Sequence, residues 1–193
     1  MASDRTINRK QQILETLAHL LENPKREKIT TASLAAKLDV SEAALYRHFA
    51  NKAQMFEGLI EFIEASIFGV INKITTDETD GAKQVQLIIT MLLKFAEKNP
   101  GMTRLLIGDA LVNEELHLQT RINLLHDRVE ASLKQSLKIA AAESESESGK
   151  KIMPEAQANL MICYVIGRWQ QYVKSGFKRK PTELMQQQLS LLS

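Results

Sequence analysis

Residues 34–49, LAAKLDVSEAALYRHF, decide the fold of the N-terminal part of the chain. The stretch holds two short runs of helical periodicity, and the tripeptide Asp39-Val40-Ser41 separates them. A helix-turn-helix has this arrangement, because its two short helices cross steeply at a tight turn. The turn residue often has positive φ, which Asp39 tolerates better than most residues. Ser41 is a good N-cap for the second helix. The stretch therefore predicts a helix-turn-helix.

The second helix of this unit has an apolar and a polar face. Leu45 and Phe49 close a small core, so the opposite face carries Glu42, Ala43, Tyr46 and Arg47. Small side chains allow close approach to base edges, and Tyr, Arg, His and Lys donate hydrogen bonds to phosphates. The pattern favours DNA binding. The alternative is an ordinary helical hairpin with a solvated polar face.

Helical periodicity also dominates the remainder of the chain. The only four prolines and eight glycines among 193 residues argue for long helices. The apolar spacing predicts further helices around 13–21, 51–74, 82–98, 102–112, 113–141, 154–175 and 181–192. The charged tract at 143–151, ESESESGKK, is expected to be a mobile loop. No strand or repeat is expected, so we predict an all-α fold of about nine helices.

The amino-acid composition excludes only a few classes of protein. The net charge of +2 is too small to identify a partner, although residues 1–52 are mildly basic, with nine Lys and Arg against six Asp and Glu. Cys163 is the single cysteine, which excludes a disulfide framework and favours the reducing cytoplasm; we expect it to be a small core residue. No apolar stretch is long enough to span a membrane.

The sequence offers no support for catalysis. His19, His48, His117 and His126 lack the spacing of metal ligands, and no glycine-rich phosphate loop or nucleophile elbow is present. We therefore expect no enzyme activity, no metal and no cofactor.

Residues 29–56, ITTASLAAKLDVSEAALYRHFANKAQMF, resemble the TetR-type DNA-binding domain. The family pattern runs through an Ala, a Gly-Val-Ser-type turn, Leu-Tyr-x-x-Phe and a following Lys; Asp39 in place of glycine is the one departure in the turn. The resemblance implies a helix-turn-helix domain over 7–67, with its core at 30–49. A C-terminal helical domain for dimerisation and partner binding would follow over 68–193.

The TetR-type pattern also implies DNA contacts at matching positions. Contacts to backbone phosphates are expected from Thr30, Thr31, Tyr46, His48 and Lys52. Positions in or beside the major groove are expected for Ser41, Ala43, Ala44 and Arg47.

The helix around 154–175 is apolar over much of its circumference. We expect a homodimer interface to contain six apolar or aromatic side chains of this helix, which are Leu160, Val165, Ile166, Trp169, Tyr172 and Val173. The alternative is a core helix that is fully buried within one protomer. TetR-type proteins dimerise through their last two helices, and this resemblance favours the interface. We expect one dimer or more at each DNA site.

Three segments, SEAALYRHF, MFEGLIEFIEASI and NPGMTRLLIGDAL, are similar to the nucleoid occlusion factors within this family. The resemblance implies binding to palindromic chromosomal sites of the GTGAG…CTCAC kind and inhibition of assembly of the tubulin-like division protein FtsZ. It implies that a groove between the fourth and fifth helices receives the C-terminal tail of FtsZ, at Phe62, Met91, Lys98 and Asn99. Val70 and Lys94 depart from the pattern. A cytoplasmic protein associated with the nucleoid is expected.

Two other functions stay open at this point. The first is a conventional TetR-type repressor that a small hydrophobic ligand releases from DNA, and the second is a protein-interaction module without DNA binding. A ligand-gated repressor needs a cavity with some convergent polar groups. The helix around 82–98 is so uniformly apolar that a polar effector would find few partners, which favours nucleoid occlusion.

Overall fold

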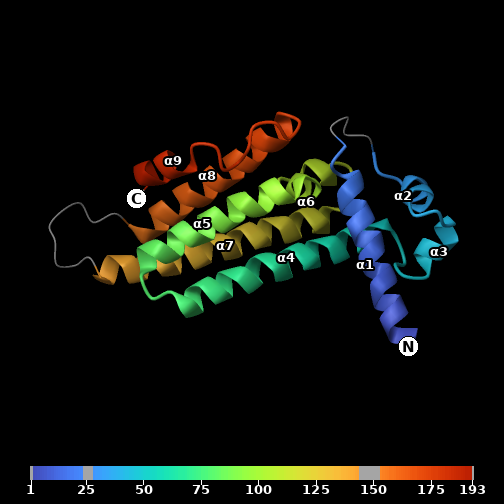
Figure 1. The fold of residues 1–193 in the computed structure, drawn as a ribbon, viewed down its shortest axis with the longest axis horizontal. Coiled ribbons are helices and arrows are strands. Elements are labelled where there is room, and N and C mark those ends of the chain that lie inside the picture. Colours follow the sequence, from blue (N-terminus) through green and yellow to red (C-terminus); the bar gives the residue numbers. More distant parts are fainter. Residues whose placement is uncertain (1, 24–27, 144–152, 193) are drawn as a thin grey trace. The chain divides into compact units, whose positions relative to one another are not determined.

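The computed structural model describes residues 2–23, 28–143 and 153–192, and every regular element in these ranges is a helix (Figure 1). The all-α fold is therefore confirmed. The expected loop at 143–151 lies almost entirely outside the described residues. The elements are α1 (Ala2–Leu20), α2 (Thr31–Lys37), α3 (Glu42–Tyr46), α4 (Lys52–Asp77), α5 (Gly81–Lys98), α6 (Pro100–Leu106), the 3₁₀ helix η1 (Asp109–Leu111), α7 (Leu116–Glu143), α8 (Pro154–Lys174) and α9 (Met185–Leu192).

The chain divides into two compact units. Unit 1 consists of residues 1–63 and 99–122, and unit 2 of residues 64–98 and 123–193. The family resemblance implies a domain boundary between residues 67 and 68, and this boundary stays a prediction. The compact units follow packing instead, because α6 packs against α1 although it follows α5 in the chain.

Unit 1 buries the apolar stripe of α1 against the helices that follow. Ile13 and Leu17 of α1 are fully or almost fully buried, as are Leu34 of α2 and Leu45 of α3. Helix α6 approaches α1 very closely, since a Cβ atom added at Gly101 would lie 1.9 Å from the carbonyl oxygen of Ala18. Only glycine permits this contact, which joins α6 to α1.

A buried arginine strengthens the same contact between α1 and α6. Arg104 donates from Nη1 to the carbonyl oxygens of Leu21 at 3.0 Å and Asn23 at 3.3 Å. Its Nε donates to the carboxylate of Asp109 at 2.8 Å. The side chain is only 6% exposed, so its loss would leave buried carbonyl groups without their donor.

Unit 2 is built around the contact between α5 and α8. Trp169 is fully buried and its indole N–H donates to the carbonyl oxygen of Leu92 at 3.2 Å. A buried polar pair lies in the same unit, where the Ser136 hydroxyl donates to the side-chain oxygen of Gln84 at 2.7 Å. The amide of Gln84 in turn donates to the carbonyl oxygen of Glu78, so both polar side chains are satisfied.

Several helix boundaries differ from those expected, three of them beside residues with positive φ. The helix predicted over 102–112 corresponds to α6, which ends before Gly108, where φ is 75°. The helix predicted to begin at residue 113 is α7, which begins at Leu116 because Asn113 has a φ of 68°. Helix α9 begins at Met185 rather than 181. Residues 181–184 form a turn, and Leu184 has a left-handed φ of 61°. Positive φ values interrupt helical hydrogen bonding, which apolar periodicity alone does not reveal.

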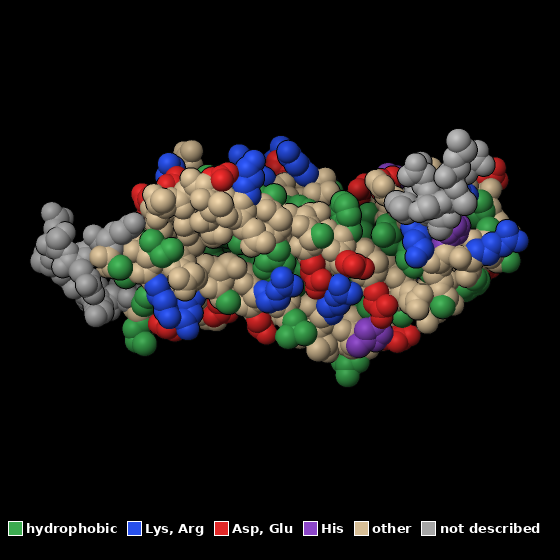
Figure 2. Space-filling view, turned by 90° about the horizontal axis from the view of Figure 1, so that it is seen from below, with side chains coloured by type: hydrophobic (Ala, Val, Ile, Leu, Met, Phe, Trp, Pro, Cys, Tyr) green, Lys and Arg blue, Asp and Glu red, His purple; other side chains and the backbone are tan. Residues whose placement is uncertain are grey.

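The prediction that Cys163 is a core residue is wrong, because its side chain lies on the exposed face of α8. Within the described ranges no helix is long and apolar enough to cross a membrane. Acidic and basic side chains are interspersed on the face that Figure 2 shows, in keeping with the small net charge.

Candidate nucleic-acid interface

Helices α2 and α3 form the predicted helix-turn-helix, and each begins with a side-chain cap. Thr30 and Ser33 form a capping box, in which each side chain accepts from the backbone N–H of the other residue at 3.1 Å. Ser41 caps α3 by accepting from the N–H of Ala44 at 3.3 Å. These caps satisfy amide groups at the two helix starts that have no partner within a helix.

The turn between the two helices places Asp39 in the left-handed region, with a φ of 54°. The following N–H, of Val40, donates to the carbonyl oxygen of Ala35 at 3.0 Å and closes the turn against the end of α2. Ala35 and Leu45 are buried beneath it. Aspartate therefore adopts the conformation that glycine would supply, and the departure from the family pattern leaves the turn intact.

The polar face of α3 is linked to the first turn of α2. The hydroxyl of Thr31 donates to the carboxylate of Glu42 at 2.5 Å, and the phenol of Tyr46 donates to Thr31 Oγ1 at 3.4 Å. Tyr46 is 46% exposed, and Ala43 and Arg47 are exposed beside it. The structure thus brings two expected phosphate contacts, Thr31 and Tyr46, together on one surface with the expected groove residues.

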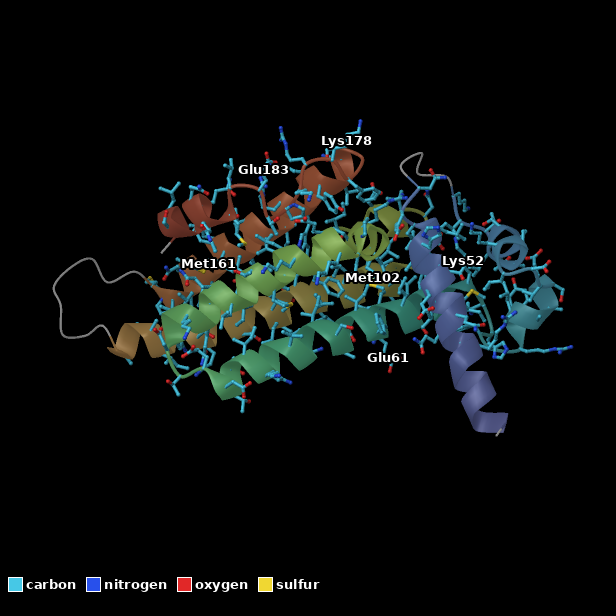
Figure 3. The ribbon with its side chains drawn as sticks, viewed as in Figure 1. Lys52, Glu61, Met102, Met161, Lys178 and Glu183 are labelled. Carbon is cyan, nitrogen blue, oxygen red and sulfur yellow. The ribbon has the colours of Figure 1, made fainter. Side chains whose placement is uncertain are left out.

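His48 and Lys52 differ from the other expected phosphate contacts. His48 is half-buried, and its Nδ1 is enclosed with no hydrogen-bond partner among the described residues, which leaves Nε2 as the atom for a phosphate. Lys52 forms an ion pair with Glu114, and its Nζ lies 5.4 Å from the centroid of the Phe56 ring. Its side chain is 22% exposed. Lys52 is labelled in Figure 3. A phosphate at the expected contact would have to compete with Glu114 for this lysine.

Most of the side chains expected in the dimer interface are buried inside the protomer. Val165 and Trp169 are fully buried, and Tyr172 and Val173 are each 4% exposed. Tyr172 also donates from its phenol to the carbonyl oxygen of Glu97 at 3.2 Å. The expected interface is corrected at these four positions, because a side chain enclosed by its own protomer presents no surface to a second one. Ile166 is half-buried, and Leu160 is 53% exposed.

The residues expected to bind FtsZ divide between the two units. Phe62, 49% exposed, and Asn99, half-buried, belong to unit 1. Met91, half-buried, and Lys98, exposed, belong to unit 2. A shared groove for these four residues stays a prediction.

The sequence patterns do not indicate three charged side chains that bind other parts of the protein through hydrogen bonds or ion pairs. Arg104 and Arg168 are 6% and 8% exposed, and Glu114 holds Lys52. Arginine is usually exposed, so a one-dimensional pattern gives no signal for a buried one. The pairing of Glu114 with Lys52 joins positions 62 residues apart in the sequence, which no local motif reports.

A capped helix-turn-helix followed by a long helical region defines the class of TetR-type DNA-binding proteins. The family model described as bacterial regulatory proteins, tetR family, matches residues 26–59. A second model, SlmA-like C-terminal domain of tetracyclin repressor-like proteins, matches residues 79–193. Solved structures agree with this fold. The fatty acid degradation regulator FadR from Bacillus halodurans superposes with a TM-score of 0.76 at 14% identity, and the transcriptional regulator FadR from Bacillus subtilis with a TM-score of 0.73 at 15% identity, each over 94% of this chain and 96% of its own.

Much more similar sequences identify the branch of this class. The nucleoid occlusion factor SlmA of Alteromonas mediterranea is 50% identical over 97% of this chain and 95% of its own length. The SlmA proteins of Shewanella amazonensis and Marinomonas sp. are 48% and 44% identical over 97% and 99% of this chain, and 94% and 96% of their own. The chain belongs to the SlmA family of nucleoid occlusion factors.

Proposed function

We propose that this protein is a homodimeric nucleoid occlusion factor that binds palindromic chromosomal sites and, in its DNA-bound form, inhibits FtsZ assembly. Division septa would then not form over the nucleoid. The observation that carries the proposal is similarity of 44–50% identity to nucleoid occlusion factors along nearly the whole chain. The similarity extends beyond the helix-turn-helix, whereas a repressor with another role would be expected to share mainly that domain.

The DNA-binding half of the proposal is supported by the polar surface on α2 and α3. Thr31 and Tyr46 lie beside the exposed Arg47, so phosphate donors and a base-reading side chain share one surface. Ala43 is exposed between them, and its small side chain permits close approach to a base edge. Band-shift titrations with a duplex carrying the GTGAG…CTCAC palindrome test this half, and equal affinity for a scrambled duplex at matched salt would contradict it.

Dimerisation is supported by the exposed face of α8. Leu160, Cys163 and Gly167 are all exposed and recur at spacings of three and four residues, so they share one side of the helix. Apart from its chain neighbours and the backbone of its own helix, no described atom lies within 4 Å of the position that a Cβ would take at Gly167, which leaves this side open to a second helix. A two-fold dimer presents two recognition helices to the half-sites of a palindrome. Sedimentation should give twice the monomer mass, and Leu160→Glu should give monomers.

The FtsZ-binding half is supported by the exposed aromatic ring of Phe62, since exposed aromatic residues are common anchors for protein partners. Light scattering of polymerising FtsZ is the decisive measurement. The protein with its palindromic duplex should lower the scattering, and the protein with a scrambled duplex should lower it less. If neither mixture changes the scattering while DNA binding is intact, the TetR-type repressor released by a small hydrophobic ligand replaces this proposal.

A further inference from the structure

The connection between α8 and α9 carries a concentration of positive charge in unit 2. The sequence KSGFKRK, residues 174–180, contributes Lys174, Lys178, Arg179 and Lys180, and all four side chains are exposed. Among the described residues, only Lys180 of these four has an acidic partner, which is Glu97 at 3.3 Å. Lys178 points away from the helix in Figure 3. We call residues 174–180 the basic loop.

Hydrogen bonds hold the basic loop in one conformation. The hydroxyl of Ser175 accepts from the N–H groups of Lys178 at 3.1 Å and Arg179 at 2.8 Å. Phe177 has a left-handed φ of 66°, and its N–H donates to the carbonyl oxygen of Tyr172 at 2.9 Å. The two aromatic rings meet edge to face, with centroids 5.3 Å apart. The loop therefore presents its cations from a fixed backbone, which lowers the entropy lost on binding.

A buried arginine lies directly beneath this loop. Arg168 donates to the carbonyl oxygens of Lys180 and Glu183, both at 2.8 Å, and of Pro181 at 3.1 Å. Arg168 also donates from Nη1 to the side-chain oxygen of Gln171 at 3.1 Å. None of these acceptors carries a negative charge, so Arg168 adds to the positive potential instead of being neutralised.

The basic loop lies against the C-terminal end of α5. Glu97 accepts from the hydroxyl of Thr182 at 2.5 Å and pairs with Lys180, while its backbone carbonyl accepts from Tyr172. Lys98, which follows Glu97, is one of the residues expected to bind FtsZ. The loop and this end of α5 therefore form a joint surface within unit 2.

We propose that the basic loop docks an acidic peptide segment of the protein partner, adding a contact outside the predicted groove; this inference rests on the proposed FtsZ-binding function. Two features favour a peptide over nucleic acid. Glu97 is a fixed carboxylate within the surface, which repels a continuous phosphate backbone but lets separate acidic side chains reach the lysines beside it. The half-buried Phe177 ring offers an apolar contact next to the cations.

The double variant Lys178→Gln with Arg179→Gln tests the proposal on the full-length protein. It removes two exposed charges and leaves the backbone N–H groups that bond to Ser175 in place. The control, Lys134→Gln with Lys138→Gln on α7, removes the same charge from another surface of unit 2. Binding of labelled full-length FtsZ is measured by anisotropy at low and high salt, with the palindromic duplex present. Band shifts and co-sedimentation with anionic vesicles are measured in parallel.

The expected result is an affinity for FtsZ lowered about threefold or more at low salt in the loop variant, with the difference shrinking at high salt. The control should keep the wild-type affinity, and DNA binding should not change in either variant. Unchanged FtsZ affinity in the loop variant overturns the inference and leaves the proposed function standing. A loss of DNA or vesicle binding in place of FtsZ binding also overturns it, by assigning the loop to phosphate ligands. If the wild-type protein does not bind FtsZ, the proposed function itself fails.

Discussion

Lys52, at the first position of α4, forms an ion pair with Glu114, in the connection that precedes α7. Both side chains are largely buried, with exposed fractions of 22% and 15%. The position of Lys52 matches a phosphate contact of the TetR-type pattern. Its ammonium group therefore has one partner within the protein, Glu114, and one predicted partner outside it, a DNA phosphate. A DNA phosphate at this predicted contact would therefore compete with Glu114 for Lys52.

The first prediction concerns this competition. Glu114→Gln should tighten DNA binding about two- to threefold on palindromic and scrambled duplexes alike, because a phosphate contact positions the protein without reading sequence. Lys52→Gln should weaken binding to both duplexes and reduce the salt dependence by about one counterion. Band shifts over a salt series provide the measurement.

Glu115→Gln is the matched control for this experiment, because it removes the same charge from an exposed neighbour. If Glu114→Gln and Glu115→Gln tighten binding equally, net charge alone explains the effect and Lys52 is not restrained by its partner.

The second prediction concerns the turn of the helix-turn-helix. Asp39→Val should destabilise the protein by about 1–2 kcal/mol, because a β-branched residue is strained at a φ of 54°. Asp39→Gly should be neutral or slightly stabilising at the same position. Urea denaturation gives both free energies of unfolding. Equal stability of the two variants would show that the left-handed turn is not maintained in solution.

The third prediction concerns the arginine beneath the basic loop. Arg168→Met should lower the free energy of unfolding by about 2–4 kcal/mol, because three carbonyl groups lose their donor. The exposed Arg179→Met is the control and should change stability by about 0.5 kcal/mol or less. Equal losses for both variants would exclude a structural role for Arg168.

The fourth prediction is a pH dependence at Glu97. The hydrogen bond from Thr182, followed by the contacts with Lys180, holds the pKa of Glu97 below its ordinary value. A carboxylate with a lowered pKa in the folded state stabilises the protein above its unfolded-state pKa, and this stabilisation is lost as the pH falls through the folded-state pKa. Glu97→Gln should therefore be less stable than wild type near neutral pH, and the difference should shrink in acid.

Thermal unfolding between neutral and acidic pH measures this difference. Glu61→Gln, at an exposed position of α4, serves as the control for the loss of one negative charge. A stability difference between Glu97→Gln and wild type that stays constant down to strongly acidic pH would contradict the lowered pKa.

The fifth prediction separates the two proposed activities. Phe62→Ala should weaken the inhibition of FtsZ assembly in light scattering and leave band shifts unchanged, because its exposed ring is expected to contact the partner and not DNA. Val112→Ala, a truncation at another exposed apolar side chain, controls for a general loss of surface. A loss of both activities with Phe62→Ala would reject this division of labour.

Local sequence signals predicted the N-terminal helices well. The caps at Thr30 and Ser41 and the left-handed Asp39 depend on residues within four positions of one another, so the chemistry that fixes them is visible in one short stretch. Asn51 caps α4 by the same local chemistry, since its side chain accepts from the N–H of Gln54 at 2.8 Å, while the side-chain oxygen of Gln54 accepts from the N–H of Ala50 at 2.9 Å.

The same reasoning could not separate the side chains of α8 that are buried within the protomer from those that are exposed. A helix that is apolar around much of its circumference does not reveal which side its own protomer covers. The indole N–H of Trp169 finds its acceptor on α5, at Leu92, and this contact buries the side previously expected to meet a second protomer. Cys163 and Leu160 are left on the outer side by the same packing.

The sequence alone determined the all-α class, the helix-turn-helix and the family, because periodicity, caps and turn residues act over a few positions. Tertiary structure decided which charges are engaged and which apolar side chains are covered. The pairing of Lys52 with Glu114 and the burial of Arg168 beneath the basic loop join segments whose proximity depends on how helices pack. Such contacts arise from the burial of apolar surface across the whole chain, so no single stretch of residues specifies them.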